Sequence, residues 1–414
     1  MGEHYDVIVA GGGSGGVAAA AGAARTGART LLVERGPCLG GAATLRNVLT
    51  YCGLFTRAEP HTQVVYGVAE EVMSRLRAED AVTGPQKFTA VAVVFDPETV
   101  KRVLDEVCVG AGAEPRLHTT LLDATREGDT IVSARVADHN GVHEVTAAAF
   151  VDATGEADLA TRAGAAVRYG TDGRVQAGSL GVRFGGIPAG ADVSRETVRE
   201  AVRAAKARGM EGLLAEQGLV ARLPVSGDVI AYLVDEGYDA RDARDTSRAE
   251  ISARAQSAAY LEVIRSLPGC SGAYVVTTGP ELGTRESRHV VARYRMTDGD
   301  VLGAGRFAQA VALGAWPVEY HPAPGVPSEW RFIDGDGYYE IPLDAIRSLD
   351  TANLFSAGRT IDGDRLAGGS LRVMGTAFAT GHAAGVAAAL VASGGSAQAQ
   401  DVRKELLRQD ACLP

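Results

Sequence analysis

A chain of 414 residues is longer than most single domains, so we expect two domains or one domain with a large insertion. The net charge of −10 argues against a nucleic-acid partner, because such proteins usually carry a basic face. The five cysteines form no CxxC pair and no metal spacing, which predicts reduced thiols in a cytoplasmic protein without a metal site. The first strand begins almost at once and leaves no room for a signal peptide. The longest apolar stretch, 376–393, consists mainly of small residues and predicts a packed internal helix rather than a membrane span.

The N-terminal segment predicts a strand over 5–10, a helix over 16–26 and a second strand over 30–34. Two parallel strands joined by a helix form a βαβ unit. Further along we expect a helix over 96–111 and strands over 116–124, 130–138, 143–148 and 150–153, with a hairpin turn at Asn140-Gly141. These elements are typical of a parallel sheet that carries an antiparallel β-meander.

The middle of the chain has a different pattern. Helices over 195–208 and 248–267 alternate with strands over 229–234 and 273–277, and the proline-rich segment 318–336 predicts a loop that covers a site. A strand over 354–357 and the small-residue helix then return to the character of the N-terminal region. We therefore predict an α/β protein with a discontinuous nucleotide-binding domain, 1–167 and 339–414, and an inserted α+β substrate or cap domain, 168–338.

The glycine motif Gly11-x-Gly13-x-x-Gly16 follows a strand and opens a helix, which is the context that a Rossmann-type dinucleotide site requires. Its backbone, with Ser14 and Gly15, is expected to bind a pyrophosphate at the start of the helix. Glu34 ends the second strand, where a carboxylate accepts hydrogen bonds from ribose hydroxyls, and Arg35 follows it. The motif predicts NAD or FAD.

Two later segments bear on this choice: Asp152-Ala-Thr154-Gly155, with Asp158 after it, and Ala357-Gly358-Arg359. With them the chain resembles the glutathione-reductase-type FAD proteins. More closely, it resembles the bacterial FAD-dependent oxidoreductase family related to thiazole synthases and to the fumarate reductase and aspartate oxidase group. The matching blocks are 39–44, 283–288, 339–342, 371–374 and 381–385.

The resemblance implies FAD as the cofactor and assigns further residues to it. Gly40, Gly41 and Ala42 would pass close to the pyrophosphate and the flavin ring, and Leu122 would contact the adenine through its backbone. Thr154, Gly155 and Asp158 would complete the flavin site. The residues expected at the flavin N1–C2=O edge, with the start of the last helix, are Gly358, Val373 and Met374. Arg359 and Arg372 are also assigned to the cofactor.

The resemblance also implies candidates for catalysis. Arg285 and Arg288 would hold a carboxylate or act on protons, since a guanidinium binds a carboxylate through two hydrogen bonds. His321 or Tyr339 would serve as acid or base over the flavin. Cys38 is either a covalent flavin attachment point or a packing residue, and His382 is expected to be a packing residue.

These features predict a dehydrogenase or oxidase that transfers a hydride between a small organic substrate and flavin N5. No second glycine fingerprint occurs, so the expected electron acceptor is oxygen, a quinone or an electron carrier. Two alternatives remain: an FAD-binding protein with a structural flavin or a role in RNA modification, and an NAD-dependent dehydrogenase. A homo-oligomer is also compatible with the sequence.

Overall fold

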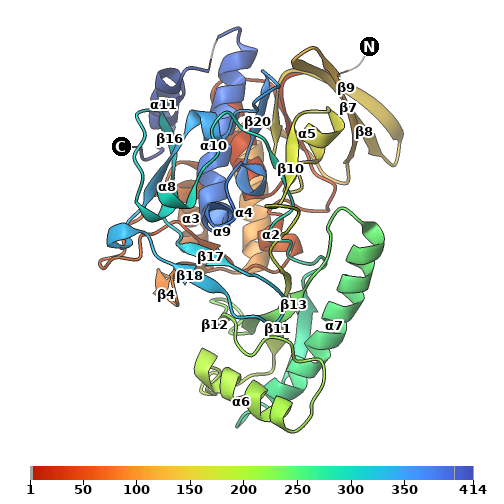
Figure 1. Ribbon diagram of the computed structural model, residues 1–414, viewed down its shortest axis with the longest axis vertical. Helices are drawn as coiled ribbons and strands as arrows, with labels where there is room; N and C mark the ends of the chain where they lie inside the picture. The colour runs from red at the N-terminus through yellow and green to blue at the C-terminus, as the bar shows by residue number, and fades with distance from the viewer. Residues whose placement is uncertain (1–2, 396, 414) are drawn as a thin grey trace.

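The computed structural model describes residues 3–395 and 397–413, and its centre is a seven-stranded sheet (Figure 1). The order along the sheet is β6 (Glu114–Arg116), β2 (Thr30–Val33), β1 (Glu3–Ala10), β9 (Gly141–Asp152), β8 (Thr130–Asp138) and β7 (Thr120–Glu127), and β20 (Leu354–Ser356) also pairs with β9. The strands β6, β2, β1, β9 and β20 are parallel. The strands β7, β8 and β9 form an antiparallel meander. The predicted fold class is confirmed.

The parallel part of the sheet is buried on both faces. Along β1, Val7 and Val9 pack into the largest hydrophobic core, whereas Ile8 and Ala10 pack into a second core on the other face. Parallel strands covered on both faces usually have such continuous apolar runs. The larger core includes α1 (Ser14–Arg25), α4 (Pro97–Gly110) and α10 (Met374–Ala392), and the smaller one includes α5 (Asp158–Arg162).

The helices α1 and α10 approach each other closely because small residues line their contact. A Cβ atom on Gly381 would lie 2.0 Å from the carbonyl oxygen of Gly15, and one on Gly385 would lie 1.9 Å from that of Ala19. In Figure 1, α10 (blue) crosses the middle of the molecule. Within the described residues it is the one helix long and apolar enough to cross a membrane, and 83% of its most apolar window is buried inside the protein.

The middle of the chain forms a second, antiparallel sheet, which lies at the lower end of Figure 1 with α6 and α7. Its order is β12 (Val220–Arg222), β13 (Val229–Glu236), β11 (Gly178–Gly185) and β14 (Tyr274–Thr278). The helices α6 (Arg195–Ala207) and α7 (Ala243–Arg265) contribute buried residues to the separate core of this region.

The hydrophobic clusters bear on the domain boundaries. The separate core of the middle region runs from Leu180 to Leu282, whereas Met296, Val318 and Ile333 pack into the largest core. The boundaries at 168 and 338 therefore stay a prediction, and the packing favours an inserted unit that ends nearer Leu282.

Three local expectations were wrong in detail. The strand expected over 116–124 is broken, because His118 adopts a left-handed backbone conformation (φ 52°) between β6 and β7. The strands expected over 143–148 and 150–153 are the single strand β9. The segment 318–336 contains a hairpin of β17 (Val318–Tyr320) and β18 (Glu329–Arg331), since its prolines lie in the connection and leave both strands free to pair.

Replacing Gly385 with alanine should destabilise the protein, because the added methyl group would overlap the backbone of α1. We expect a loss of about 1–3 kcal/mol in the free energy of unfolding, measured by thermal or chemical denaturation. The control is Gly110→Ala at the end of α4, where a Cβ meets no atom within 4 Å. Equal stability of the two variants would contradict the close contact between α1 and α10.

Candidate active site

The glycine loop between β1 and α1 combines two packing positions with one that faces a cleft. A Cβ atom placed on Gly11 would lie 2.4 Å from the carbonyl oxygen of Ala153. A Cβ atom placed on Gly16 would lie 1.8 Å from the carbonyl oxygen of Gly11. On Gly13 it would meet no atom within 4 Å, and this residue lines the cleft. The loop thus keeps its backbone at the edge of the cleft, as a dinucleotide site requires.

The start of α1 supplies hydrogen-bond donors to the same cleft. No side chain caps this helix, so the first N–H groups have no partner within it. Ser14 and Gly15 line the cleft, and the buried Oγ of Ser14 has no hydrogen-bond partner among the described residues. Such a helix start favours the binding of phosphate.

Glu34, which follows β2, ties the glycine loop to the next segment. Its carboxylate accepts hydrogen bonds from the N–H groups of Gly12 (2.7 Å) and Gly36 (2.6 Å). A carboxylate offers about four acceptor positions, so capacity remains for ribose hydroxyls.

Gly40 and Gly41 lie directly against the glycine loop. The N–H group of Gly40 donates to the carbonyl of Gly12 at 2.8 Å, and a Cβ on Gly41 would lie 3.0 Å from the Cα of Gly13. Both residues have positive φ angles (113° and 53°), which glycine tolerates best. Ala42 follows as the first residue of α2 (Ala42–Leu45).

The ends of β9 and β20 form another wall of the cleft. Thr154 donates from Oγ1 to Asp152 at 2.7 Å, and the N–H group of Gly358 donates to Thr380 Oγ1 at 3.1 Å. Gly155 leaves room for Arg359, since a Cβ there would lie 2.3 Å from a guanidinium nitrogen. Parallel strands that end at one sheet edge therefore place these residues together.

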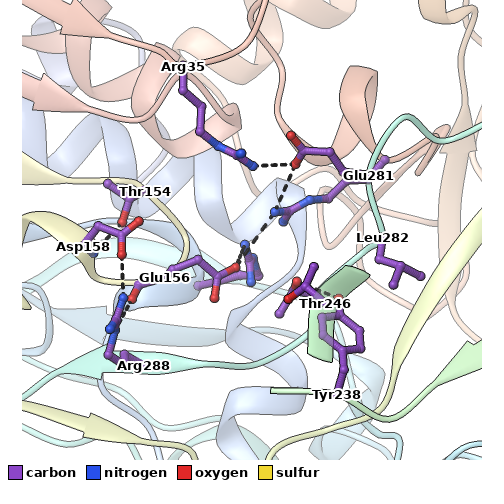
Figure 2. Close-up of polar contacts among 12 residues, drawn as sticks. Arg35, Thr154, Glu156, Asp158, Tyr238, Thr246, Glu281, Leu282 and Arg288 are labelled. Atoms are coloured by element: carbon purple, nitrogen blue, oxygen red, sulfur yellow. Dashed lines mark hydrogen bonds and ion pairs between the residues drawn. The ribbon is translucent and has the colours of Figure 1, made fainter. Parts of the chain in front are cut away.

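A chain of ion pairs crosses the cleft (Figure 2). Arg35 lies 2.6 Å from Glu281, which lies 3.6 Å from Arg46; Arg46 is 3.9 Å from Glu156, which is 3.1 Å from Arg359. Glu281 belongs to the middle region, whereas the other four residues follow elements of the nucleotide-binding region. The chain thus connects the two regions beside the glycine loop.

A cavity of about 720 Å³ opens from the cleft toward the middle sheet. Ser179, Tyr232 and Asp235 line it from that sheet, and Thr50 and Cys52 line it from β3 (Thr50–Cys52). The residues that line both the cleft and the cavity are Ala42, Arg46, Arg359, Arg372 and Met374. A ligand in the cleft would therefore adjoin a ligand in the cavity.

Polar side chains gather on one wall of this cavity. His321 Nε2 lies 3.1 Å from Glu319 Oε1, while Glu319 Oε2 lies 3.5 Å from Arg372 and accepts a hydrogen bond of 3.2 Å from Trp316. Arg285 also lines the cavity; it donates to the carbonyl of Ala177 at 2.6 Å.

The charges of this cluster follow from its burial. Burial, and then the charge of Arg285, lower the pKa of His321 to about 4, although Glu319 opposes this shift. Burial alone would raise the pKa of Glu319, but the hydrogen bond from His321 and the charges of Arg372 and Arg285 lower it. Burial also lowers the pKa of Arg372 to about 10. At neutral pH the cluster therefore holds a carboxylate, an uncharged imidazole and guanidinium ions.

Most of the residues predicted for the cofactor lie together. Those that line the cleft are Gly11, Gly13, Ser14, Gly15, Glu34, Arg35, Gly40, Gly41, Ala42, Thr154, Gly155, Gly358, Arg359, Arg372 and Met374. Val373, Arg285 and His321 line the larger cavity.

The other predicted residues line neither space. Tyr339, in β19 (Tyr339–Pro342), is fully buried and its hydroxyl lies 2.8 Å from Ser370 Oγ. Arg288 binds Asp158 at 2.5 Å, and the carbonyl of Leu122 accepts a hydrogen bond from Arg162. Cys38 is also absent from both linings, and His382 packs against Gln409, to which it is hydrogen-bonded at 2.8 Å. We therefore do not include Tyr339 or Arg288 in the proposed catalytic group.

Several lining residues were missed from the sequence. Arg46 follows the Leu39–Thr44 block by two residues. Glu319 lies in β17 and precedes His321, which directly follows the strand, by two residues. The alternation within β17 was the signal that could have identified Glu319.

Two histidines, the buried His382 and the largely buried His321, should make the protein less stable in mild acid. Burial lowers the pKa of both His321 and His382 to about 4, below the ordinary value of 6.5. Between these pH values the unfolded chain binds protons that the folded chain does not, so the free energy of unfolding falls as the pH drops from about 6.5 to about 4. The free energy of unfolding of His382→Gln, measured by denaturation at about pH 7 and pH 5, should fall less between these pH values than that of the parent. His139→Gln, at an exposed turn, is the control, and a loss equal to the parent's in His382→Gln would contradict this account.

Three buried polar atoms at the cleft fit an FAD molecule. Besides Ser14 Oγ, Arg359 Nη1 and Arg372 Nε have no hydrogen-bond partner among the described residues, and all three residues line the cleft. Donors of this kind match phosphate and carbonyl oxygens, which FAD carries in its diphosphate and its flavin ring.

Comparisons with solved structures show a shared fold. A geranylgeranyl bacteriochlorophyll reductase-like protein from Thermoplasma acidophilum matches with a TM-score of 0.52 and 14% identity, over 99% of this chain and 84% of that one. BexE, studied for oxidation during BE-7585A biosynthesis, matches with 0.51 and 16%, over 98% and 66%. A variant of the flavin-dependent brominase Bmp2 matches with 0.50 and 14%, over 98% and 84%. A search of curated proteins found no match.

The family comparison covers nearly the whole chain. The model of the family described as FAD dependent oxidoreductase matches residues 6–410. FAD, rather than NAD, is thus the cofactor. The chain belongs to the FAD dependent oxidoreductase family and is an FAD-dependent oxidoreductase.

Proposed function

We propose that the protein is a dehydrogenase or oxidase that acts on a small organic substrate in the 720 Å³ cavity. The observation that carries this proposal is the continuity of the cavity with the FAD cleft through their shared lining residues. A cavity of this size is typical of small-molecule sites, which lie in the range of about 300–1,000 Å³. Bound FAD supplies the capacity to exchange a hydride with a substrate carbon at flavin N5.

His321 is the proposed acid or base. The Glu319 carboxylate accepts a hydrogen bond of 3.1 Å from Nε2–H of His321. Nδ1 then carries the free lone pair, which takes a proton from the substrate. The lowered pKa of His321 keeps the ring uncharged at neutral pH, which leaves one ring nitrogen with a free lone pair. Trp316 and Arg372 orient Glu319, and thereby the imidazole, through their contacts with the carboxylate.

The electron acceptor and the finer family relation are part of the proposal. The lack of a second glycine fingerprint in the sequence supports oxygen, a quinone or an electron carrier as acceptor. A specific relation to thiazole synthases or fumarate reductases stays a prediction, as do a cytoplasmic location and a homo-oligomer. The competing hypotheses are a structural flavin and a role on RNA. Substrate-dependent reduction of the flavin would exclude a purely structural flavin.

Gly13→Val should abolish FAD binding without unfolding the protein. Its side chain would project into the cleft, where a Cβ meets no protein atom within 4 Å. The parent should show flavin absorbance that moves to the supernatant on acid precipitation, and the variant should be colourless with an unchanged circular dichroism spectrum. Gly84→Val, at another open position outside the cleft, is the control. A yellow Gly13→Val protein would contradict the assigned diphosphate position, and colour retained in the parent's pellet would indicate a covalent flavin.

His321→Gln should slow substrate-dependent bleaching of the flavin under anaerobic conditions. The loss of a general base costs about 10²–10⁴-fold in rate. The Kd for FAD, measured by quenching of flavin fluorescence in the apoprotein, should change little because His321 lines the cavity and not the cleft. Glu319→Gln, which keeps the imidazole but removes the charge beside it, should give an intermediate rate. An unchanged rate in His321→Gln would exclude the histidine as acid or base.

A further inference from the structure

Both tryptophans of the 414-residue chain, Trp316 and Trp330, line the substrate cavity. Their ring centroids are 5.9 Å apart, and Trp330 also stacks on Phe332 at 6.5 Å. Phe88, from the turn between β4 (Gln86–Lys87) and β5 (Val91–Val94), lines the same cavity. The aromatic side chains thus form one wall, which we call the aromatic wall and define as Trp316, Trp330 and Phe88.

The tryptophan N–H groups of this wall already have partners. Trp316 donates to Glu319 at 3.2 Å and Trp330 donates to Ser328 Oγ at 2.9 Å. Trp316 is almost fully buried (5% exposed), so the ring surface that a ligand can reach belongs mainly to the half-buried Trp330. Ring surfaces bind other flat rings by offset or edge-to-face stacking.

The cations that line the cavity each lie within 4.0 Å of a carboxylate, with one exception, although Arg46 shares Glu281 with Arg35 and Glu156 with Arg359. The pairs are Arg46–Glu281 (3.6 Å), Lys87–Glu59 (2.9 Å), Arg203–Glu216 (2.9 Å), Arg285–Asp235 (3.7 Å), Arg359–Glu156 (3.1 Å) and Arg372–Glu319 (3.5 Å). An anionic ligand would have to give up its hydration without finding an unpaired cation in the inner part of the cavity. The pairing therefore disfavours a carboxylate substrate.

The exception is Arg195 at the start of α6. It donates to Thr89 Oγ1 at 3.0 Å and has no carboxylate within 4.0 Å among the described residues. Its side chain is exposed, so its charge is screened by solvent and exerts little force on a ligand deep in the cavity.

We propose that the substrate is an uncharged, planar aromatic molecule that stacks on the aromatic wall, with a hydroxyl or similar neutral group directed to His321. The inference rests on the proposed function, and it names the substrate class of the same site. It replaces the earlier expectation that Arg285 and Arg288 bind a carboxylate, because Arg285 faces Asp235 and Arg288 lies outside the cavity lining.

The test compares three ligands of similar size on the FAD-loaded protein by isothermal titration calorimetry. Naphthalene-2-methanol is flat and neutral, naphthalene-2-carboxylate is flat and anionic, and decahydronaphthalene-2-methanol is neutral but not aromatic. Naphthalene-2-methanol should bind at least about tenfold more tightly than naphthalene-2-carboxylate and severalfold more tightly than decahydronaphthalene-2-methanol. Tighter binding of the carboxylate, or equal binding of the saturated alcohol, would overturn the proposal.

Two variants connect these preferences to the residues. Trp330→Leu should weaken binding of the aromatic alcohol severalfold, while Tyr274→Leu, an exposed aromatic residue outside the cavity lining, should leave it unchanged. Asp235→Asn frees the charge of Arg285 with little change in shape, so it should raise the affinity for the carboxylate at least about tenfold. If Asp235→Asn leaves the affinity for the carboxylate unchanged, charge pairing does not set the preference.

Failure of this inference differs from failure of the proposed function. A yellow protein whose flavin is bleached by an anionic substrate would keep the oxidoreductase proposal and reject the neutral aromatic substrate. A protein that binds naphthalene-2-methanol but shows no flavin reduction with any substrate would reject the oxidoreductase proposal and keep the preference for a neutral aromatic ligand.

Discussion

The close contact between α1 and α10 is the constraint on which the rest of the site depends. Gly15 faces Gly381 and Ala19 faces Gly385, so the two helices run parallel with their backbones nearly touching. In this register α10 begins about six residues before the level at which α1 begins, an advance of about 9 Å at the rise of an α-helix. The start of α1 thus faces the cleft, while the start of α10 reaches the boundary between the cleft and the substrate cavity. Two positive helix ends at different depths match the charge distribution of FAD, whose diphosphate and flavin ring are separated along the molecule.

The second determinant is how the protein places charge around the substrate cavity. Arginines from both regions surround the cavity, but each inner one lies near a carboxylate, and the histidine among them is held uncharged by burial and by Arg285. Such pairing keeps buried cations from standing alone, which would be costly in a poorly solvated site. It also keeps the imidazole uncharged at neutral pH, because its pKa lies at about 4.

The sequence predicted most of the residues that line the cleft, because much of that lining is backbone. Gly11, Gly13 and Gly16 are readable as a motif. Gly11 and Gly16 must lack a side chain because the backbone beside them is too close, and β1 and β2 have apolar runs that define their ends. The same holds for Gly358, which has a positive φ at the end of β20. Residues defined by such local constraints can be located without a structure.

The substrate half could not be predicted in the same way, because its residues come from segments far apart in the chain. Glu319 and His321 meet Arg285 and Arg372 only through the packing of β17 against α9 (Ala367–Leu371) and the middle sheet. Tyr339 and His321 looked equally suitable as an acid or base, but one lies in the core and the other lines the cavity. The pairing of β17 with β18 was hidden by the prolines between them, which indicated an irregular loop.

The most direct test of the account is a crystal structure of the FAD-bound protein. The account predicts the diphosphate at the start of α1 beside Gly13 and Ser14, and the flavin ring bounded by Arg46, Arg359 and Met374, with one face open to the cavity that holds His321. A flavin ring placed away from these residues, or one whose reactive edge is sealed off from the cavity, would contradict it.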